Sequence, residues 1–156
     1  MSETSLPAIR RDIQRVSPEL VRAASQFQAA ILADVGGRRG ALGGRIAPLS
    51  PRIKVAGPAF TVELRPGDNL MFHAALALAQ PGDVIVVEGK GDRSAALCGT
   101  IMTTQAQASG LAGFVVDAAV RDSDEIIESG FPVFSVGTNP NGPTKGLPRR
   151  VNWPVS

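Results

Sequence analysis

The chain has 156 residues, a length typical of one domain. Its hydrophobic content of 44% and charged content of 19% allow a sizeable core and exclude wholesale disorder. A net charge of only +2, dispersed basic residues and the absence of Tyr argue against a nucleic-acid-binding protein that stacks bases.

The sulfur content and hydropathy limit the class of protein further. The single cysteine, Cys98, excludes an intrachain disulfide and a cysteine-based zinc cage. No signal peptide is evident, and no apolar stretch is long enough to span a bilayer. We therefore expect a cytoplasmic protein that has no membrane partner.

The N-terminal part is predicted to combine an arm and a helix. Residues 1–16 are polar and mixed in charge, which predicts a flexible arm ahead of one domain over residues 17–156. Ser17, Pro18 and Glu19 supply a hydroxyl cap, a first-turn proline and a first-turn acid, which are typical of a helix start. Apolar residues then recur at helical spacing, so we predict a helix over residues 18–34.

The rest of the chain is predicted to alternate between strands and helices. Because aromatic residues are scarce, we expect Val, Leu, Ile and Ala to fill the core. This alternation favours an α/β fold. Apolar runs and turn residues predict strands over 55–64, 83–88, 113–118 and 133–136, and helices over 68–79, 99–109 and 122–129.

Arg121 and Asp122 directly follow the apolar run over residues 113–120. A guanidinium presents a planar fork that matches a carboxylate in two contacts. Asp is a hard oxygen ligand, and Mg²⁺ commonly takes one or two carboxylates while it keeps several waters. The alternatives are a surface Arg121 that pairs with Asp124 or Glu125, and an Asp122 that only caps the following helix.

Gly99 is predicted to begin a helix, so residues 99–102 would offer free backbone N–H groups to an anion. The alternative is that this glycine only allows close packing. If the segment lies beside Arg121 and Asp122, the three together would form a small site for a carboxylate and a metal ion.

Four other residues are weaker candidates. Asp92, in the glycine-rich loop predicted over residues 89–92, could approach the site from a neighbouring strand end. His73 lies in an apolar helix, where we expect a packed side chain. Cys98 has no evident base and is expected to be a small buried residue. Nothing obvious would depress the pKa of Lys90, so a Schiff base is not expected there.

Several segments occur here in one combination: residues 81–88, Gly91-Asp92, Gly99, residues 113–122 and residues 130–133. In this combination the chain resembles the RraA-like family. That family includes 4-hydroxy-4-methyl-2-oxoglutarate and 4-carboxy-4-hydroxy-2-oxoadipate aldolases, and regulators of ribonuclease E activity. The resemblance runs from about Leu20 to Val155 and is most specific at Gly99 with Arg121, Asp122 and Glu125.

The resemblance implies a swivelling β/β/α domain that assembles as a homotrimer or hexamer. It also implies a small 2-oxo acid substrate and a divalent metal, Mg²⁺ or Mn²⁺, rather than a Schiff base. Asp122 would hold the metal, and Arg121 would bind the substrate and steady an enolate oxygen. The backbone that grips the pyruvyl carboxylate would be that of Gly99, Thr100, Ile101 and Met102.

The implied activity is that of a carbon–carbon lyase. A metal-dependent aldolase would cleave 4-hydroxy-4-methyl-2-oxoglutarate to pyruvate, and oxaloacetate decarboxylase activity would pass through the same pyruvate enolate. A metal ion and a guanidinium stabilise such an enolate as its charge develops. The ribonuclease-regulator branch typically lacks an acid after the Arg, so Asp122 favours the enzyme.

Two alternatives stay open. One is a non-catalytic RraA-like regulator that binds ribonuclease E or another protein. The other is an enzyme that acts on a different 2-oxo or hydroxy acid in the same site.

The chain departs from the family pattern at two places. Many aldolase members carry an acid where this chain has Thr100. Members usually continue with further strands where this chain stops at Ser156. We therefore expect the domain over residues 17–156 to lack the usual C-terminal strands and to leave apolar sheet surface open.

Overall fold

The computed structural model describes residues 8–156. Its described part contains one five-stranded sheet with the order β1-β5-β4-β3-β2. Neighbours among β2 to β5 pair in parallel, and β1 pairs antiparallel with β5 at the edge. The strands are β1 (Ala47–Pro48), β2 (Ala59–Glu63), β3 (Val84–Ala96), β4 (Gly113–Val120) and β5 (Val133–Thr138).

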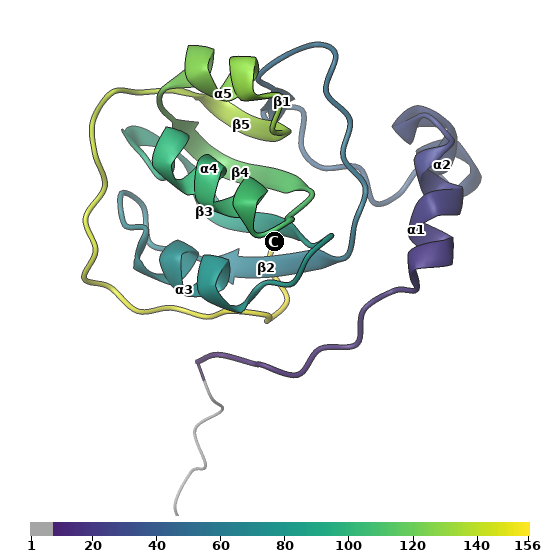
Figure 1. Ribbon diagram of the computed structural model, residues 1–156, viewed down its shortest axis with the longest axis horizontal. Helices are drawn as coiled ribbons and strands as arrows, with labels where there is room; N and C mark the ends of the chain where they lie inside the picture. The colour runs from purple at the N-terminus through teal and green to yellow at the C-terminus, as the bar shows by residue number, and fades with distance from the viewer. Residues whose placement is uncertain (1–7) are drawn as a thin grey trace, which may run out of the picture.

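Three helices connect the parallel strands and cover one face of the sheet (Figure 1). These are α3 (Leu70–Leu78), α4 (Thr100–Ala108) and α5 (Ser123–Ser129). All eight residues of the central strand β4 are buried, as expected for a parallel strand. Because parallel strands end at the same edge, the residues that follow β4 and β5 lie next to each other there.

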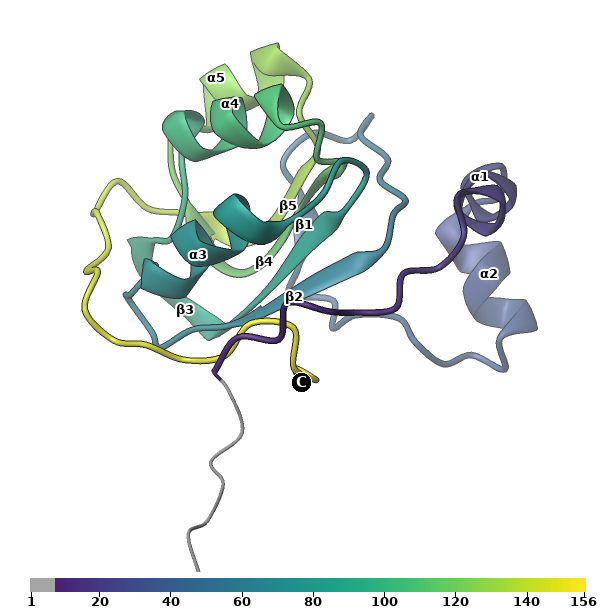
Figure 2. The same cartoon turned by 60° about the horizontal axis from the view of Figure 1, so that its bottom comes forward.

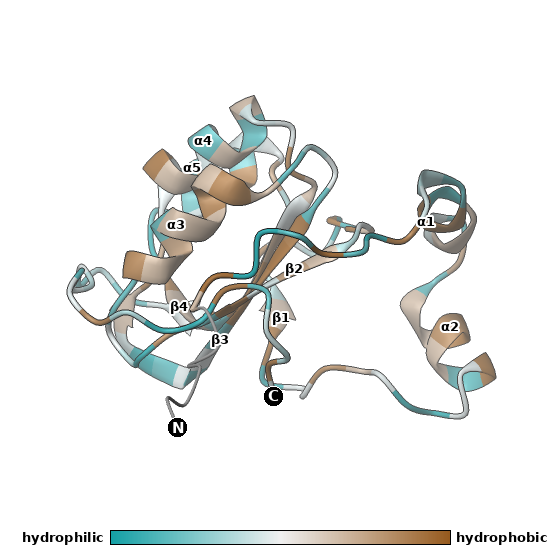
Figure 3. Ribbon diagram, turned by 90° about the horizontal axis from the view of Figure 1, so that it is seen from below, coloured by the Kyte–Doolittle hydropathy of each residue, from teal (hydrophilic) through white to brown (hydrophobic). Residues whose placement is uncertain are grey.

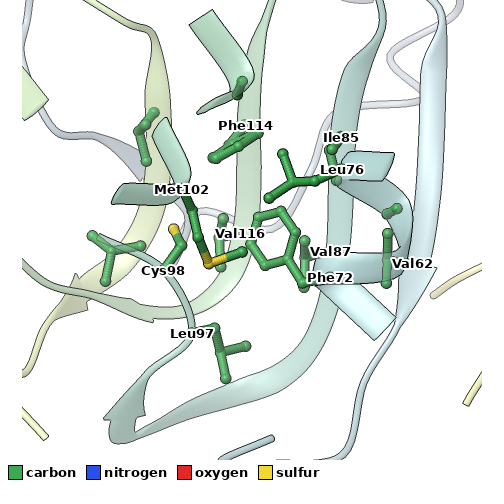
Figure 4. Close-up of a cluster of buried hydrophobic side chains, with 14 of the residues drawn as sticks. Val62, Phe72, Leu76, Ile85, Val87, Leu97, Cys98, Met102, Phe114 and Val116 are labelled. Atoms are coloured by element: carbon green, nitrogen blue, oxygen red, sulfur yellow. The ribbon is translucent and has the colours of Figure 1, made fainter. Parts of the chain in front are cut away.

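The core lies between this helical layer and the sheet (Figure 4). Phe114 of β4 packs edge-to-face against Phe72 of α3 and against Phe131, with ring centroids 5.0 Å apart in both pairs. Edge-to-face pairs add to the stability gained from burial alone. The core is therefore less purely aliphatic than we predicted.

The prediction of one continuous helix over residues 18–34 is wrong. The structure has two short helices instead, α1 (Pro18–Ser25) and α2 (Ala29–Val35). Ser17 does cap α1, because its hydroxyl accepts a hydrogen bond from the backbone N–H of Leu20 at 3.2 Å. The Ser25 hydroxyl donates to the carbonyl of Arg22, and neither helix has a buried residue. A long helix thus lacks the packing that usually stabilises it.

The predicted loop over residues 89–92 is also wrong, since β3 continues through it to Ala96. A Cβ at Gly89 would lie 2.7 Å from the carbonyl oxygen of Asp117 in β4, so the two strands are in close contact there. Lys90 and Gly91 have positive φ angles, and the register between β3 and β4 shifts on both sides of Asp92. The glycines therefore form an irregular strand and not a phosphate-type loop.

The segment that precedes α1 lies against the domain. Ile9 and Val151 form a bridge, and Asn152 donates a side-chain hydrogen bond to the carbonyl of Arg10 at 2.8 Å. Arg15 forms a two-contact ion pair with the buried Asp83, 2.8 Å in each contact. The prediction of a flexible arm did not anticipate these contacts for residues 8–16, and its residues 1–7 lie outside the described part.

Helices α1 and α2 stand off to one side of the sheet (Figure 2). Apolar and polar residues alternate along them (Figure 3). Leu20, Phe27 and Ile31, which recur at helical spacing, are 58%, 50% and 48% exposed. No helix among residues 8–156 is long and apolar enough to cross a membrane.

Asp68 connects the start of α3 to the C-terminal loop. Its fully buried carboxylate accepts hydrogen bonds from the backbone N–H of Leu70 at 3.0 Å and from Gly146 at 2.7 Å. It also accepts from the Thr144 hydroxyl at 2.9 Å and the Leu147 N–H at 3.2 Å. Burial alone would raise the pKa of Asp68, but these donors outweigh it and lower the pKa.

We predict that Asp68→Asn lowers the free energy of unfolding by about 3 kcal/mol, because an amide nitrogen would face backbone donors. Urea denaturation at neutral pH measures this loss, with exposed Asp34→Asn as the control. The folded-state pKa is lowered, so the native carboxylate stabilises the fold above its unfolded pKa and loses this effect as the pH falls through the folded value. The gap between wild type and variant should therefore shrink in acid; a gap that stays constant would contradict the assignment.

Candidate functional site

The structure brings Arg121 and Asp122 to the edge of the sheet where β4 ends. Asp122 adopts a left-handed backbone conformation, with φ 55° and ψ 41°, immediately before α5. Its side chain makes no capping hydrogen bond to α5. Instead, Oδ2 accepts a hydrogen bond from the backbone N–H of Thr100, the first residue of α4, at 3.0 Å. The alternative of a routine helix cap is therefore excluded.

Gly99 allows this contact. An added Cβ at residue 99 would lie 2.3 Å from Oδ2 of Asp122 and 2.9 Å from Cγ of Arg121. Real Cβ atoms do not show such short distances, so a side chain at residue 99 would displace the partly exposed side chains of Asp122 and Arg121 from the start of α4. The structure thus shows close packing at Gly99, and this close approach places the start of α4 beside Asp122.

Arg121 points its charge toward this junction and not along α5. Its Nε lies 3.6 Å from Oδ2 of Asp122, and its backbone N–H donates to the carbonyl of Cys98 at 3.0 Å. The structure shows no ion pair between Arg121 and Asp124 or Glu125 within residues 8–156. With 42% of its side chain exposed, Arg121 is available to an anionic ligand.

Two hollows meet at Arg121 and Asp122. A cavity of about 120 Å³ lies between α3, the start of α4 and the C-terminal loop. A more open hollow of about 340 Å³ lies toward Thr138, Asn139 and Pro140, which follow β5. The smaller cavity is lined by Asn69, His73, residues 96–99, Ile101, Met102, Arg121, Asp122, Pro143 and Lys145.

The four backbone N–H groups predicted to grip a carboxylate do not all remain free. The N–H of Thr100 is bound to Asp122, and that of Met102 donates to the carbonyl of Gly99 at 3.1 Å. Those of Gly99 and Ile101 have no hydrogen-bond partner in the part of the chain that the structure describes. The positive end of α4 therefore offers two free donors at the cavity that contains Arg121.

Three residues of this cavity were not predicted from the sequence as part of a site. His73 was expected to be a packed side chain, yet it is only partly buried and lines the cavity with Lys145. Asn69 donates its amide N–H to the carbonyl of Leu97 at 2.9 Å, whereas its buried Oδ1 has no partner among the described residues. Only the one-turn spacing of Asn69 and His73 on α3 hinted at a shared face.

Three weaker candidates lie outside the reactive arrangement. Cys98 is buried beside the cavity, and burial, with a smaller effect of Asp122, raises its thiol pKa to about 12, so it is not a nucleophile. Asp92 is occupied by the backbone N–H and hydroxyl of Ser94, each at 3.0 Å. Lys90 pairs with the buried Glu88 on β3.

Asp122 can serve as a ligand for a hard divalent cation. Its side chain is 38% exposed, and its Oδ1 has no hydrogen-bond partner within residues 8–156. The described residues contain no group of three His, Cys, Asp or Glu side chains that could enclose a metal. One open carboxylate suits Mg²⁺ or Mn²⁺, which retain water ligands, and does not suit a closed zinc site.

Fold and site together define a single-domain α/β protein in which a guanidinium, a carboxylate and free backbone N–H groups meet at one edge of the sheet. The chain belongs to the RraA-like family, because the family model described as Aldolase/RraA matches residues 17–156. This confirms the family inferred from the sequence. A relative from Halalkalibacterium halodurans, named "Putative 4-hydroxy-4-methyl-2-oxoglutarate aldolase", is 41% identical over 111 residues, 71% of this chain and 53% of that protein.

Solved structures share the fold. The Streptomyces coelicolor protein RraAS2, described as an unusual member of the RNase ES inhibitor RraA family, has a TM-score of 0.80 and 32% identity over 92% of this chain and 76% of its own. The RNA-processing inhibitor RraA from Thermus thermophilis has a TM-score of 0.75 and 27% identity over 83% of this chain and 78% of its own. The predicted α/β fold class is confirmed. The chain spans about half the length of the curated relatives it matches.

We predict that Gly99→Ala destabilises the fold by about 1 kcal/mol, because the added methyl group displaces the Asp122 carboxylate and breaks its hydrogen bond to the Thr100 N–H. Chemical denaturation measures this loss. Gly43→Ala is the matched control, since a Cβ there would meet nothing within 4 Å. Equal, small effects of the two substitutions would show that the junction is looser than the structure indicates.

Proposed function

We propose that the protein is a divalent-metal-dependent aldolase that cleaves 4-hydroxy-4-methyl-2-oxoglutarate-like 2-oxo acids to pyruvate. The contact of Arg121 and Asp122 with the start of α4 carries this proposal, because it gathers a guanidinium, a carboxylate and free backbone donors at one cavity. The name of the Halalkalibacterium halodurans relative supports the same reaction.

The cleavage needs an electron sink at the 2-oxo group. A water molecule takes the proton of the 4-hydroxyl group, the C3–C4 bond breaks, and its electron pair enters the C2 carbonyl to form an enolate. C3 then takes up a proton from water to give pyruvate, and the other fragment leaves as a second pyruvate. In oxaloacetate, the same enolate forms when the bond to the C4 carboxylate breaks and CO₂ leaves.

Each residue at the junction has a defined task in this proposal. The free N–H groups of Gly99 and Ile101 bind the C1 carboxylate, and the Arg121 guanidinium contacts the C2 oxygen as its negative charge develops. Asp122 would hold Mg²⁺ or Mn²⁺, which supplies Lewis-acid stabilisation of that charge. The buried, unpaired Oδ1 of Asn69 can accept a hydrogen bond from the substrate hydroxyl.

A non-catalytic role is the second candidate. Two structural neighbours are described as inhibitors of RNA processing or of RNase ES, which favours a regulator that binds ribonuclease E or another protein. That role does not require a carboxylate at residue 122. A folded, metal-loaded protein that releases no pyruvate from either substrate would support it.

We also propose that the chain works as a cytoplasmic homotrimer or hexamer, as the family resemblance implies. A hollow of about 580 Å³ on the side of α2 is lined mainly by apolar side chains, among them Leu32, Val55, Val115 and Phe134. Together with the exposed apolar residues of α1 and α2, it provides surface that association would bury.

We predict that Asp122→Asn lowers the rate of metal-dependent pyruvate release by at least about 100-fold, while the fold stays intact. Asn tolerates the left-handed conformation that Ala would strain, so the substitution tests charge and not backbone geometry. Pyruvate release from 4-hydroxy-4-methyl-2-oxoglutarate and from oxaloacetate, with Mg²⁺ and with EDTA, is the measurement. Exposed Asp124→Asn is the control.

If Asp122→Asn released pyruvate at the wild-type rate, the proposal that Asp122 holds a catalytic metal ion would be wrong. Arg121→Lys should fail as well, because a point charge cannot reproduce a two-contact fork.

We predict that sedimentation at micromolar concentration gives a mass of three or six times the 16.2 kDa chain. The physical reason is the removal of the apolar surface around α1 and α2 from water. A monomer at these concentrations would contradict the proposed assembly without affecting the assignment of Asp122.

A further inference from the structure

Arginine side chains gather where the segment before α1 and the C-terminal segment lie side by side along β2 (Figure 2). Arg10 comes from the first segment, and Arg149 and Arg150 come from the second. Together with Trp153 they form the arginine patch. A hollow of about 390 Å³ in this patch is lined by Ala8, Glu63, Pro148, Arg149 and Arg150. It shares no lining residue with the two hollows at Arg121, so the patch is separate from the candidate functional site.

Trp153 holds two of the guanidinium groups of the patch. The guanidinium carbon of Arg10 lies 4.8 Å from the centroid of the Trp153 ring, and that of Arg150 lies 5.6 Å from it. A guanidinium is attracted to the face of an indole ring, and the contact restricts a side chain that is otherwise mobile. The ring therefore orders two positive charges in advance, which lowers the entropy lost when a ligand binds them.

The backbone beneath the patch is fixed as well. The N–H of Arg10 donates to the carbonyl of Val151 at 3.1 Å, and the N–H of Glu63 in β2 donates to the carbonyl of Arg150 at 2.9 Å. Val151 between these contacts is fully buried. The two segments that carry the arginines are thus bound to each other and to the sheet, so the patch is a built surface.

The chain itself does not neutralise the positive charge of the patch. Arg10 and Arg150 form no ion pair with any residue between 8 and 156. Arg149 lies 3.9 Å from the Glu63 carboxylate, which is longer than a hydrogen bond, and its buried Nε has no partner in the described part of the chain. Three guanidinium groups beside one carboxylate fit a ligand that carries several negative charges.

The surroundings of the patch favour a peptide over a nucleic acid. Two guanidinium groups already lie over the Trp153 ring, so a nucleobase would have to compete with them in order to stack. Pro148 lines the hollow and the adjacent Leu147 is 42% exposed, which gives apolar surface for the side chains of a peptide. Trp and Arg are also the residue types that contribute most to binding between proteins.

We propose that the arginine patch binds an acidic segment of a partner protein, whose Asp or Glu carboxylates pair with the guanidinium groups of Arg10 and Arg150. The inference does not rest on the proposed aldolase reaction, because the patch and the candidate functional site have no residue in common. It adds a docking surface that is compatible with an enzyme and with a regulator.

Fluorescence tests the inference at the patch itself, because Trp153 is the only tryptophan and the chain has no tyrosine. The probe is a peptide of alternating Glu and Ala residues, and its counterpart has Gln in place of Glu. We expect the acidic peptide to change the emission of Trp153 and to bind at least about 10-fold more tightly than its counterpart at low salt. Added salt should weaken this binding, because it screens charges on an exposed surface.

Arg10→Met and Arg150→Met should each weaken binding of the fluorescein-labelled acidic peptide by at least about 5-fold, as measured by anisotropy. Methionine keeps a long side chain against the indole ring and removes the charge, while the backbone hydrogen bonds remain. Arg52→Met is the matched control, because Arg52 is exposed, forms no ion pair within residues 8–156 and does not line the hollow. It should leave binding unchanged, and a thermal melt of each variant checks the fold.

The inference is overturned if the two peptides bind equally, if neither binds, or if Arg150→Met binds the acidic peptide as tightly as Arg52→Met does. A labelled oligouridylate that binds more tightly than the acidic peptide, and loses this affinity in Arg150→Met, would overturn it in favour of RNA. Peptide binding requires no metal ion and no 2-oxo acid. Its outcome is therefore independent of pyruvate release, which tests the proposed function alone.

Discussion

The site depends on one close contact, in which the start of α4 lies directly against the end of β4. Gly99 has no side chain, so the backbone of α4 approaches until the Thr100 N–H reaches the Asp122 carboxylate. This approach places the positive end of a helix beside a carboxylate and a guanidinium without a connecting loop. It also determines the orientation of Arg121, whose backbone N–H is held by the carbonyl of Cys98.

The parts of the structure that depend on patterns of neighbouring residues were predictable from the sequence. An apolar run followed by Arg121 and Asp122 indicated the end of a buried strand, and turn residues marked α3, α4 and α5 closely. A parallel sheet then brings such strand ends together, which is why a carboxylate-and-metal site was a reasonable expectation. The sequence left the role of Asp122 open, and its hydrogen bond to the Thr100 N–H excludes a side-chain cap of α5.

The parts that depend on distant contacts were not predictable. His73 looked like a core residue because its neighbours on α3 are apolar, and only the loop held by Asp68 turns it into part of a cavity wall. The strand β3 continues through glycines because β4 lies close to Gly89. Helical spacing overestimated the first helix, since residues 18–35 have a periodic pattern but little within the chain to pack against.

The backbone conformation of Asp122 has a consequence for how this position can change over evolutionary time. A left-handed φ of 55° favours Gly, Asn and Asp over the other residues. Both replacements lie one nucleotide from either aspartate codon, and both remove the negative charge. The genetic route to an uncharged residue at this position is therefore short, and the backbone tolerates it, whereas a Glu, which would preserve the charge, is disfavoured by the left-handed conformation. A lineage in which the negative charge has no role should carry Gly or Asn here.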